Sequence, residues 1–169
     1  MPRPRPSTQT IIEQLRAISS SQIENHQVIG PAFATVRDLV LQHGRLFTRK
    51  ALPRGQWLCT PQACYANALS AALTDGWAYV EGFATPRRGA LAVLHAWVIN
   101  PKNPAVAYDP TWPWGHEYFG IPFRLDYVLG VHGKTGHPGV LDAWELGWPL
   151  LRGEDRIADA LWNPAMLNP

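Results

Sequence analysis

The middle of the chain holds three short segments rich in β-branched and aromatic residues. They run from Trp77 to Phe83, from Leu91 to Ile99 and from Val106 to Tyr108. The connector 100–105 contains two Asn-Pro pairs, which are typical of turns. Strands joined by short turns pair most simply as an antiparallel meander. This part of the chain therefore predicts an antiparallel sheet of three to five strands.

Apolar residues at helical spacing predict helices before and after these strands in the sequence. The predicted helices cover residues 10–20, 31–43 and 61–74, and a short closing helix lies within 158–162. Pro31 suits the first turn of the second helix, and Gly44 suits its C-terminal end. Helices and strands in this order predict an α+β fold with the helices on one side of the sheet.

Three further segments are predicted to be loops, because they are rich in Pro and Gly. They are residues 48–61, 110–124 and 131–139. Residues 1–9 combine Pro and Arg with no apolar stretch after them, so they are predicted to be a disordered leader. Residues 10–169 are then predicted to form a single domain.

The composition excludes several classes of protein. Hydrophobic residues make up 46% of the chain and charged residues 17%, a balance typical of a globular protein rather than a disordered one. The net charge of +2 gives no argument for a nucleic-acid partner. No apolar run is long enough for a membrane span. Two cysteines five positions apart make a poor disulfide framework, which favours the cytoplasm unless a specialised secretion system exports the chain. The oligomeric state is not predicted.

A thiol, an imidazole and a carboxylate occur in this order, each in a different predicted element. Cys64 lies in the first turn of the helix 61–74, where N–H groups and the helix dipole stabilise a thiolate. His95 lies in the second strand, and Asp109 ends the third. A thiol nucleophile needs a base to accept its proton and a third group to orient that base. Neighbouring antiparallel strands can join His95 to Asp109, and the helix can pack its first turn over them.

Each of these three residues also has a simpler interpretation. Cys64 can be a small buried side chain, and His95 a core histidine bonded to a carbonyl. Asp109 can start a turn, since it precedes Pro110. Their order on a helix, a strand and the adjacent strand favours a catalytic interpretation over three separate structural ones.

Residues 62–112 resemble the transglutaminase-like superfamily, a branch of the papain-like cysteine enzymes. In that family a Cys opens a helix, and a Tyr-Val-x-Gly-aromatic strand, a His-Ala-Trp-Val strand and an Asp-Pro-Thr strand end follow. The corresponding segments here start at Cys64, Tyr79, His95 and Asp109. The resemblance implies a papain/transglutaminase-like core, in which the helix that carries the Cys packs on the sheet. It also implies Cys64 as nucleophile, His95 as general base and Asp109 as the group that orients the imidazole, with no metal and no cofactor.

Five further residues are candidates for substrate or oxyanion binding: Gln62, Asn67, Glu81, Trp57 and Trp112. Gln62 either donates to an oxyanion or lies on the surface at the start of the helix. Asn67 follows one turn after the cysteine, so it either lines the site or is solvated. Glu81 is either functional or paired with Arg87 or Arg88. The two tryptophans either form walls of the cleft or pack in the core.

The sequence thus predicts a cysteine-dependent hydrolase or acyltransferase that acts on a peptide bond or on a Gln or Asn carboxamide through a thioester. A protein or peptide is the expected substrate, and protease, deamidase and cross-linking transferase remain open. One alternative is a non-catalytic protein-binding module on the same fold. Two less favoured alternatives remain. One is a zinc site formed by Cys59, Cys64 and His95, with His132 and His137 as further ligands. The other is a glycosidase with Glu81 and Asp109 as paired carboxylates.

Overall fold

The computed structural model describes residues 9–24, 30–55 and 58–164, and these ranges contain both helices and strands. The strands are β1 (Arg45–Lys50), β2 (Ala78–Thr85), β3 (Val93–Asn100), β4 (Asn103–Tyr108) and β5 (Glu117–Phe123). The helices are α1 (Ile11–Glu24), α2 (Val36–His43), α3 (Cys64–Asp75), α4 (Leu125–Thr135), α5 (Pro149–Arg152) and α6 (Ile157–Ala160), with a 3₁₀ turn, η1 (Trp144–Leu146). The predicted α+β class is confirmed.

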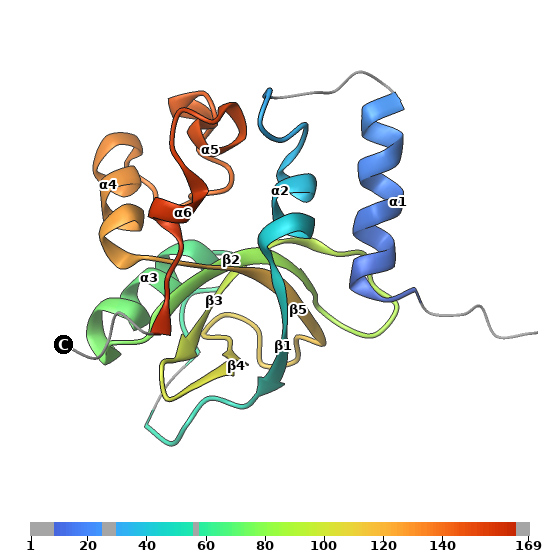
Figure 1. Ribbon diagram of the computed structural model, residues 1–169. Coiled ribbons are helices and arrows are strands. Elements are labelled where there is room, and N and C mark those ends of the chain that lie inside the picture. The colour runs from blue at the N-terminus through green and yellow to red at the C-terminus, as the bar shows by residue number, and fades with distance from the viewer. Residues whose placement is uncertain (1–8, 25–29, 56–57, 165–169) are drawn as a thin grey trace, which may run out of the picture.

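The five strands close into a barrel in the order β1-β4-β3-β2-β5 (Figure 1). The predicted meander is confirmed, because β2, β3 and β4 pair antiparallel in sequence. The prediction of a wholly antiparallel sheet is wrong: β1 runs antiparallel to β5 but parallel to β4. The reason is geometric. A closed barrel with an odd number of strands must contain at least one parallel pair, because the directions cannot alternate all the way round.

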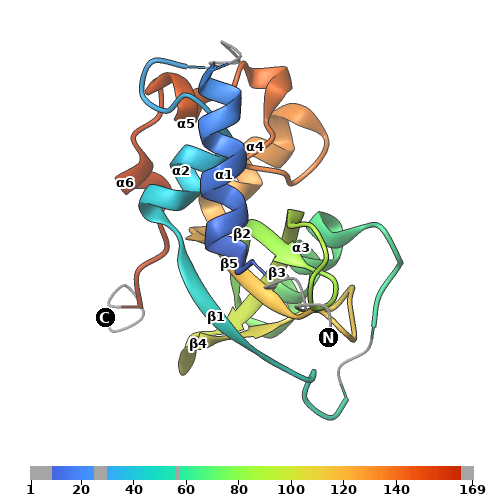
Figure 2. The ribbon, with the colours of Figure 1, turned by 90° about the vertical axis from the view of Figure 1, so that its right-hand side faces the viewer.

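The helices cover the barrel from two directions. Helix α3 packs against β2 and β3, whereas α1 and α2 contact β5. Figures 1 and 2 show α1, α2, α4 and α5 grouped at one end of the molecule, with α3 apart from them beside the sheet. The predicted arrangement of all helices on one side of the sheet is therefore only partly right. The helix that begins with Cys64 does pack on the sheet.

Two helix boundaries differ from the predicted ones at their N-terminal ends. Helix α2 begins at Val36 rather than at Pro31, because the Thr35 side chain accepts a hydrogen bond from the Asp38 N–H and caps the first turn. Helix α3 begins at Cys64 rather than near Pro61. Its predicted end is confirmed, since Gly76 adopts the left-handed conformation that stops a helix.

The inside of the barrel is filled mainly by aromatic side chains. Trp97 of β3 is completely buried there, and the rings of Phe47 and Tyr118 meet its indole edge-on at 5.6 and 5.1 Å. The indole fits because Gly120 of β5 has no side chain. A Cβ at this position would lie 2.6 Å from the Trp97 ring, closer than atoms can pack. A second apolar cluster fills the space between the outer face of the sheet and the helices.

Three predicted loops contain regular structure. Strand β1 overlaps the predicted loop 48–61, β5 lies within 110–124, and α4 covers the first part of 131–139. The short closing helix is α6, after which Leu161 bridges to Phe123. Residues 1–8 of the predicted leader lie outside the described residues. Among the residues that the structure describes, no helix is long and apolar enough to cross a membrane.

Candidate functional site

The structure brings Cys64, His95 and Asp109 together at the edge of the barrel. His95 Nε2 and Asp109 Oδ2 lie 2.7 Å apart, and both side chains are buried. Cys64 acts on the same imidazole and, together with Asp109, raises its pKa. Because Asp109 occupies Nε2, the nitrogen available to Cys64 is Nδ1. The three predicted catalytic side chains therefore lie together, with a partly exposed thiol on one side of the imidazole and a buried carboxylate hydrogen-bonded to it.

Asp109 is held by four hydrogen-bond partners. Its Oδ2 interacts with His95 and also accepts from the Tyr118 hydroxyl at 2.7 Å. Its Oδ1 accepts from the backbone N–H groups of Thr111 and Trp112 at 2.8 and 2.9 Å. These donors fix the carboxylate and compensate for its burial. Tyr118 was missed from the sequence, because it lies on β5, in a segment predicted to be a loop.

His95 is buried between aromatic rings. The indole of Trp112 stacks on the imidazole with ring centroids 3.8 Å apart and an interplanar angle of 13°. Burial disfavours the imidazolium, but the hydrogen bonds and charges of Asp109 and Cys64 outweigh it and raise the pKa of His95 to about 9. His95 is therefore a stronger base than an ordinary histidine, and Trp112, a predicted candidate, lies at the site.

Cys64 is the first residue of α3. Ala63 precedes it at the N-cap position and makes no side-chain cap, so no cap occupies the N–H groups of the first turn. Groups of this kind can bind a developing oxyanion beside the thiol. Gln62 has a φ of 65°, which is uncommon for a residue with a side chain, and it is exposed to solvent.

Asn67 is buried and connects the two chain segments that carry the site. Its Nδ2 donates to the Thr60 carbonyl at 2.7 Å and to Thr111 Oγ1 at 3.0 Å. A second connection runs from the Cys59 N–H to the Pro110 carbonyl at 2.7 Å. The segment before Cys64 is thereby fastened to the segment after Asp109. Asn67 positions the site rather than lying solvated on the helix.

Glu81 lies apart from the triad, on the outer face of β2. Its carboxylate accepts from the Tyr79 hydroxyl at 2.7 Å and from the N–H groups of Val140 and Leu141 at 2.6 and 2.9 Å. These partners take the place of the predicted pairing with Arg87 or Arg88. Glu81 therefore fastens the loop after α4 to the sheet. Burial raises its pKa to about 7 although these hydrogen bonds oppose the shift.

This buried carboxyl predicts an unusual pH dependence of stability. The folded pKa of Glu81 is about 7 and the ordinary value is 4.5, so the folded state binds the proton more tightly. The free energy of unfolding should therefore fall as the pH rises from 4.5 towards 7. The fall should be on the order of 3 kcal/mol from this group alone. Urea unfolding at pH 4.5 and 6.5 measures most of it. At pH 6.5 His95 is protonated in the folded state but only half protonated in the unfolded state, so its own contribution has to be cancelled by a matched variant.

The Glu81→Gln variant isolates the contribution of this carboxyl, because it cannot titrate. Between the same two pH values, the wild-type protein should lose more stability than this variant. The other carboxyl groups contribute equally to both proteins and cancel in the difference. Equal pH dependence in the two proteins would contradict the prediction.

The remaining candidates do not join the site. Trp57 lies outside the described residues. In the described part of the chain, no group of three or more His, Cys, Asp or Glu side chains is arranged to hold a metal ion. Cys59 is exposed, and its backbone N–H donates to the Pro110 carbonyl. Glu81 and Asp109 have separate sets of hydrogen-bond partners.

The comparisons with known proteins give no relative: no protein-family model, no curated protein and no solved structure matches this chain. The linked Cys64, His95 and Asp109 side chains are the arrangement of described residues that points most directly to a reaction.

Proposed function

We propose that this protein is a cysteine-dependent hydrolase or acyltransferase that acts on an amide, either a peptide bond or a Gln or Asn carboxamide. The observation that carries the proposal is the single imidazole of His95, which is hydrogen-bonded to a buried carboxylate and whose pKa is raised by a thiol at the start of a helix. The resemblance of residues 62–112 to transglutaminase-like enzymes supports the same assignment and a papain/transglutaminase-like core.

The reaction follows from these contacts. His95 accepts the thiol proton, and the Cys64 thiolate adds to the carbonyl carbon of the amide. N–H groups of the first turn of α3 receive the negative oxygen. The imidazolium then gives its proton to the leaving amine or ammonia as the C–N bond breaks, which leaves a thioester on Cys64. Water or a second amine attacks the thioester while His95 accepts its proton, and the C–S bond breaks to restore the thiol.

The surroundings of His95 suit both proton transfers. Its pKa of about 9 favours proton uptake from Cys64, and Asp109 stabilises the imidazolium that results. We propose a protein or peptide as the substrate and the cytoplasm as the compartment. The nature of the second reactant, water or an amine, decides between a protease or deamidase and a cross-linking transferase.

Alkylation of the two cysteines tests the proposal within one protein. At pH 7, iodoacetamide should label Cys64 much faster than Cys59, as measured by mass spectrometry of the two peptides. His95→Ala should slow the labelling of Cys64 and leave the labelling of Cys59 unchanged, because the proposed mechanism assigns His95 to Cys64 alone. Cys64→Ala should leave the fold intact.

Two other outcomes would replace the proposal. Slow and equal labelling of both cysteines would favour a protein-binding module. If a chelator exposes both thiols together, they share a metal ion, and the zinc interpretation should take over. A chelator should change neither rate if the thiol is catalytic.

A further inference from the structure

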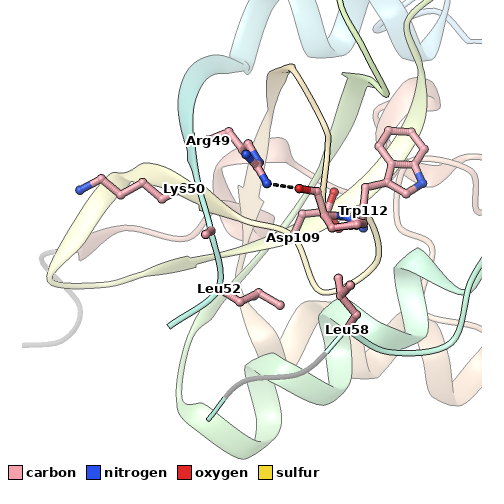
Figure 3. Close-up of a pocket in the computed structure, with 8 residues that line it drawn as sticks. Arg49, Lys50, Leu52, Leu58, Asp109 and Trp112 are labelled. Atoms are coloured by element: carbon pink, nitrogen blue, oxygen red, sulfur yellow. Dashed lines mark hydrogen bonds between the residues drawn. The ribbon is translucent and has the colours of Figure 1, made fainter. Parts of the chain in front are cut away.

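A pocket of about 190 Å³ lies directly beside the triad (Figure 3). One wall is formed by the end of β1 and the residues after it, including Arg49 and Leu52. The opposite wall is the segment from Asp109 to Pro113, and Leu58 closes one side. Its volume suits a group of about the size of one amino-acid side chain. No step of the reaction described above uses this pocket.

The charged residues of the lining are Arg49, Lys50 and Asp109. Arg49 is partly buried, and Figure 3 shows its guanidinium directed towards the segment 109–113, whereas Lys50 points away. Among the described residues, Arg49 donates one hydrogen bond, to the Pro113 carbonyl. A guanidinium carries five N–H donors in a fixed plane. Those not used by Pro113 remain for a ligand with an oxygen acceptor, and a carboxylate matches a guanidinium in both charge and geometry.

The hydrogen bonds of Asp109 go to partners other than Arg49. Asp109 lines the pocket, but its two oxygens are already committed to His95, Tyr118 and two backbone N–H groups. It therefore has little capacity left to pair with the guanidinium. Among the described residues, Arg49 thus has no carboxylate partner of its own.

The remainder of the lining is apolar. Leu52 and Pro113 belong to it, and so does Leu58, which is 50% exposed in the absence of a ligand. A ligand that covers an exposed leucine removes apolar surface from water, which favours binding. The combination of a guanidinium with these side chains fits a carboxylate on a branched aliphatic stem better than a bare inorganic anion.

Trp112 and Asp109 connect this pocket to the reaction. Trp112 lines the pocket and stacks on His95 at 3.8 Å, and Asp109 lines it and binds the other edge of that imidazole. We propose that the pocket is a substrate subsite that binds a carboxylate on an aliphatic stem, with Arg49 as the residue that selects for the charge. The assignment to substrate rests on the proposed function, whereas the binding of the carboxylate does not.

The test compares 4-methylpentanoate with the uncharged 4-methylpentanamide, which has the same stem. Binding is followed by NMR through the indole N–H of Trp112, assigned with a Trp112→Phe variant. A ligand of this size should bind the full-length protein with a Kd of about 1 mM. The amide should bind at least about tenfold more weakly, since it lacks the charge that Arg49 recognises. Higher salt should weaken the binding of the carboxylate.

Three variants assign the charge selection to Arg49. Arg49→Gln should weaken carboxylate binding about tenfold or more, and Arg54→Gln, which removes an exposed cation outside the pocket lining, should leave it unchanged. Leu58→Glu should also weaken binding, because it places a negative charge at an exposed position of the lining. This variant keeps the test decisive if loss of the Arg49 bond to Pro113 disturbs the fold.

The same measurements on Cys64→Ala separate this inference from the proposed function. Cys64 does not line the pocket, so the carboxylate should bind this variant as it binds the wild type. If the wild-type protein binds the carboxylate but its Cys64 is unreactive, the pocket is an anion-binding site without the proposed role in catalysis. The inference is overturned by no binding at about 50 mM carboxylate, by equal binding of the amide, or by unchanged binding to Arg49→Gln and Leu58→Glu.

Discussion

Replacement of Asp109 by asparagine is expected to lower the rate of acyl transfer by a factor of about 10² to 10⁴, with the fold retained. The reason lies in the four donors around the carboxylate. The N–H groups of Thr111 and Trp112 require an oxygen at the Oδ1 position. The amide NH₂ of asparagine must then occupy the Oδ2 position and face His95. The imidazole has to accept at Nε2 and carry its proton on Nδ1, so it can no longer accept the proton of Cys64.

Hydrolysis of p-nitrophenyl acetate measures this effect without knowledge of the natural substrate, because an activated ester acylates a reactive thiol directly. Both the initial burst and the steady-state rate should fall in the Asp109→Asn protein. Asp126→Asn is the matched control, since Asp126 is exposed and paired only with neighbours of its own helix end. If Asp109→Asn keeps more than about a tenth of the wild-type rate, the orienting role assigned to Asp109 is wrong.

Truncation of Trp97 to alanine should lower the free energy of unfolding by about 3 to 5 kcal/mol. The indole is completely buried inside the barrel. The rings of Phe47 and Tyr118 contact it edge-on, and it packs against Gly120, which has no side chain. A closed barrel cannot collapse easily into the space that the indole leaves. The buried indole N–H has no hydrogen-bond partner among the described residues, which offsets about 1 kcal/mol of the loss.

Trp144→Ala removes the same side chain from η1, where it is 58% exposed, and provides the matched control. Its effect on stability should stay within about 0.5 kcal/mol. Urea unfolding of the two variants and the wild type gives the comparison. A loss below about 1 kcal/mol for Trp97→Ala would show that the barrel interior repacks, contrary to the reasoning above.

The contacts among Cys64, His95 and Asp109 could be anticipated because all three lie in one helix followed by a meander. Both features have strong local signals, the helix period and the strand alternation with its Asn-Pro turns. Tyr118 had no such signal. Its strand contains Gly120 and Pro122, which favour a loop when only neighbouring residues are considered. The absent side chain of Gly120 is required by the Trp97 indole, a contact between strands far apart in the sequence.

The closure of the barrel could not be predicted from the sequence for a related reason. Strand β1 is not joined to either of its neighbours by a turn, since it pairs with β4 and β5 across long intervals of chain. Its partners cannot be deduced from local patterns, and neither can the parallel pair that closure demands. The pocket beside the triad was equally inaccessible to sequence reasoning. Its walls come from Arg49 on one side and Pro113 on the other, and they meet only when the barrel is closed.

This closure also sets an order for folding. Helix α3 and the meander are contiguous in the chain, so they can form through short loops, whereas Arg45 must find Gly120 across a long one. The Cys64, His95 and Asp109 side chains can therefore come together early in folding. Tyr118 reaches the carboxylate only when β5 docks, and Arg49 faces Pro113 only when β1 follows. A chain that folds in this order would therefore bring the Cys64 thiol to His95 before the two walls of the neighbouring pocket meet.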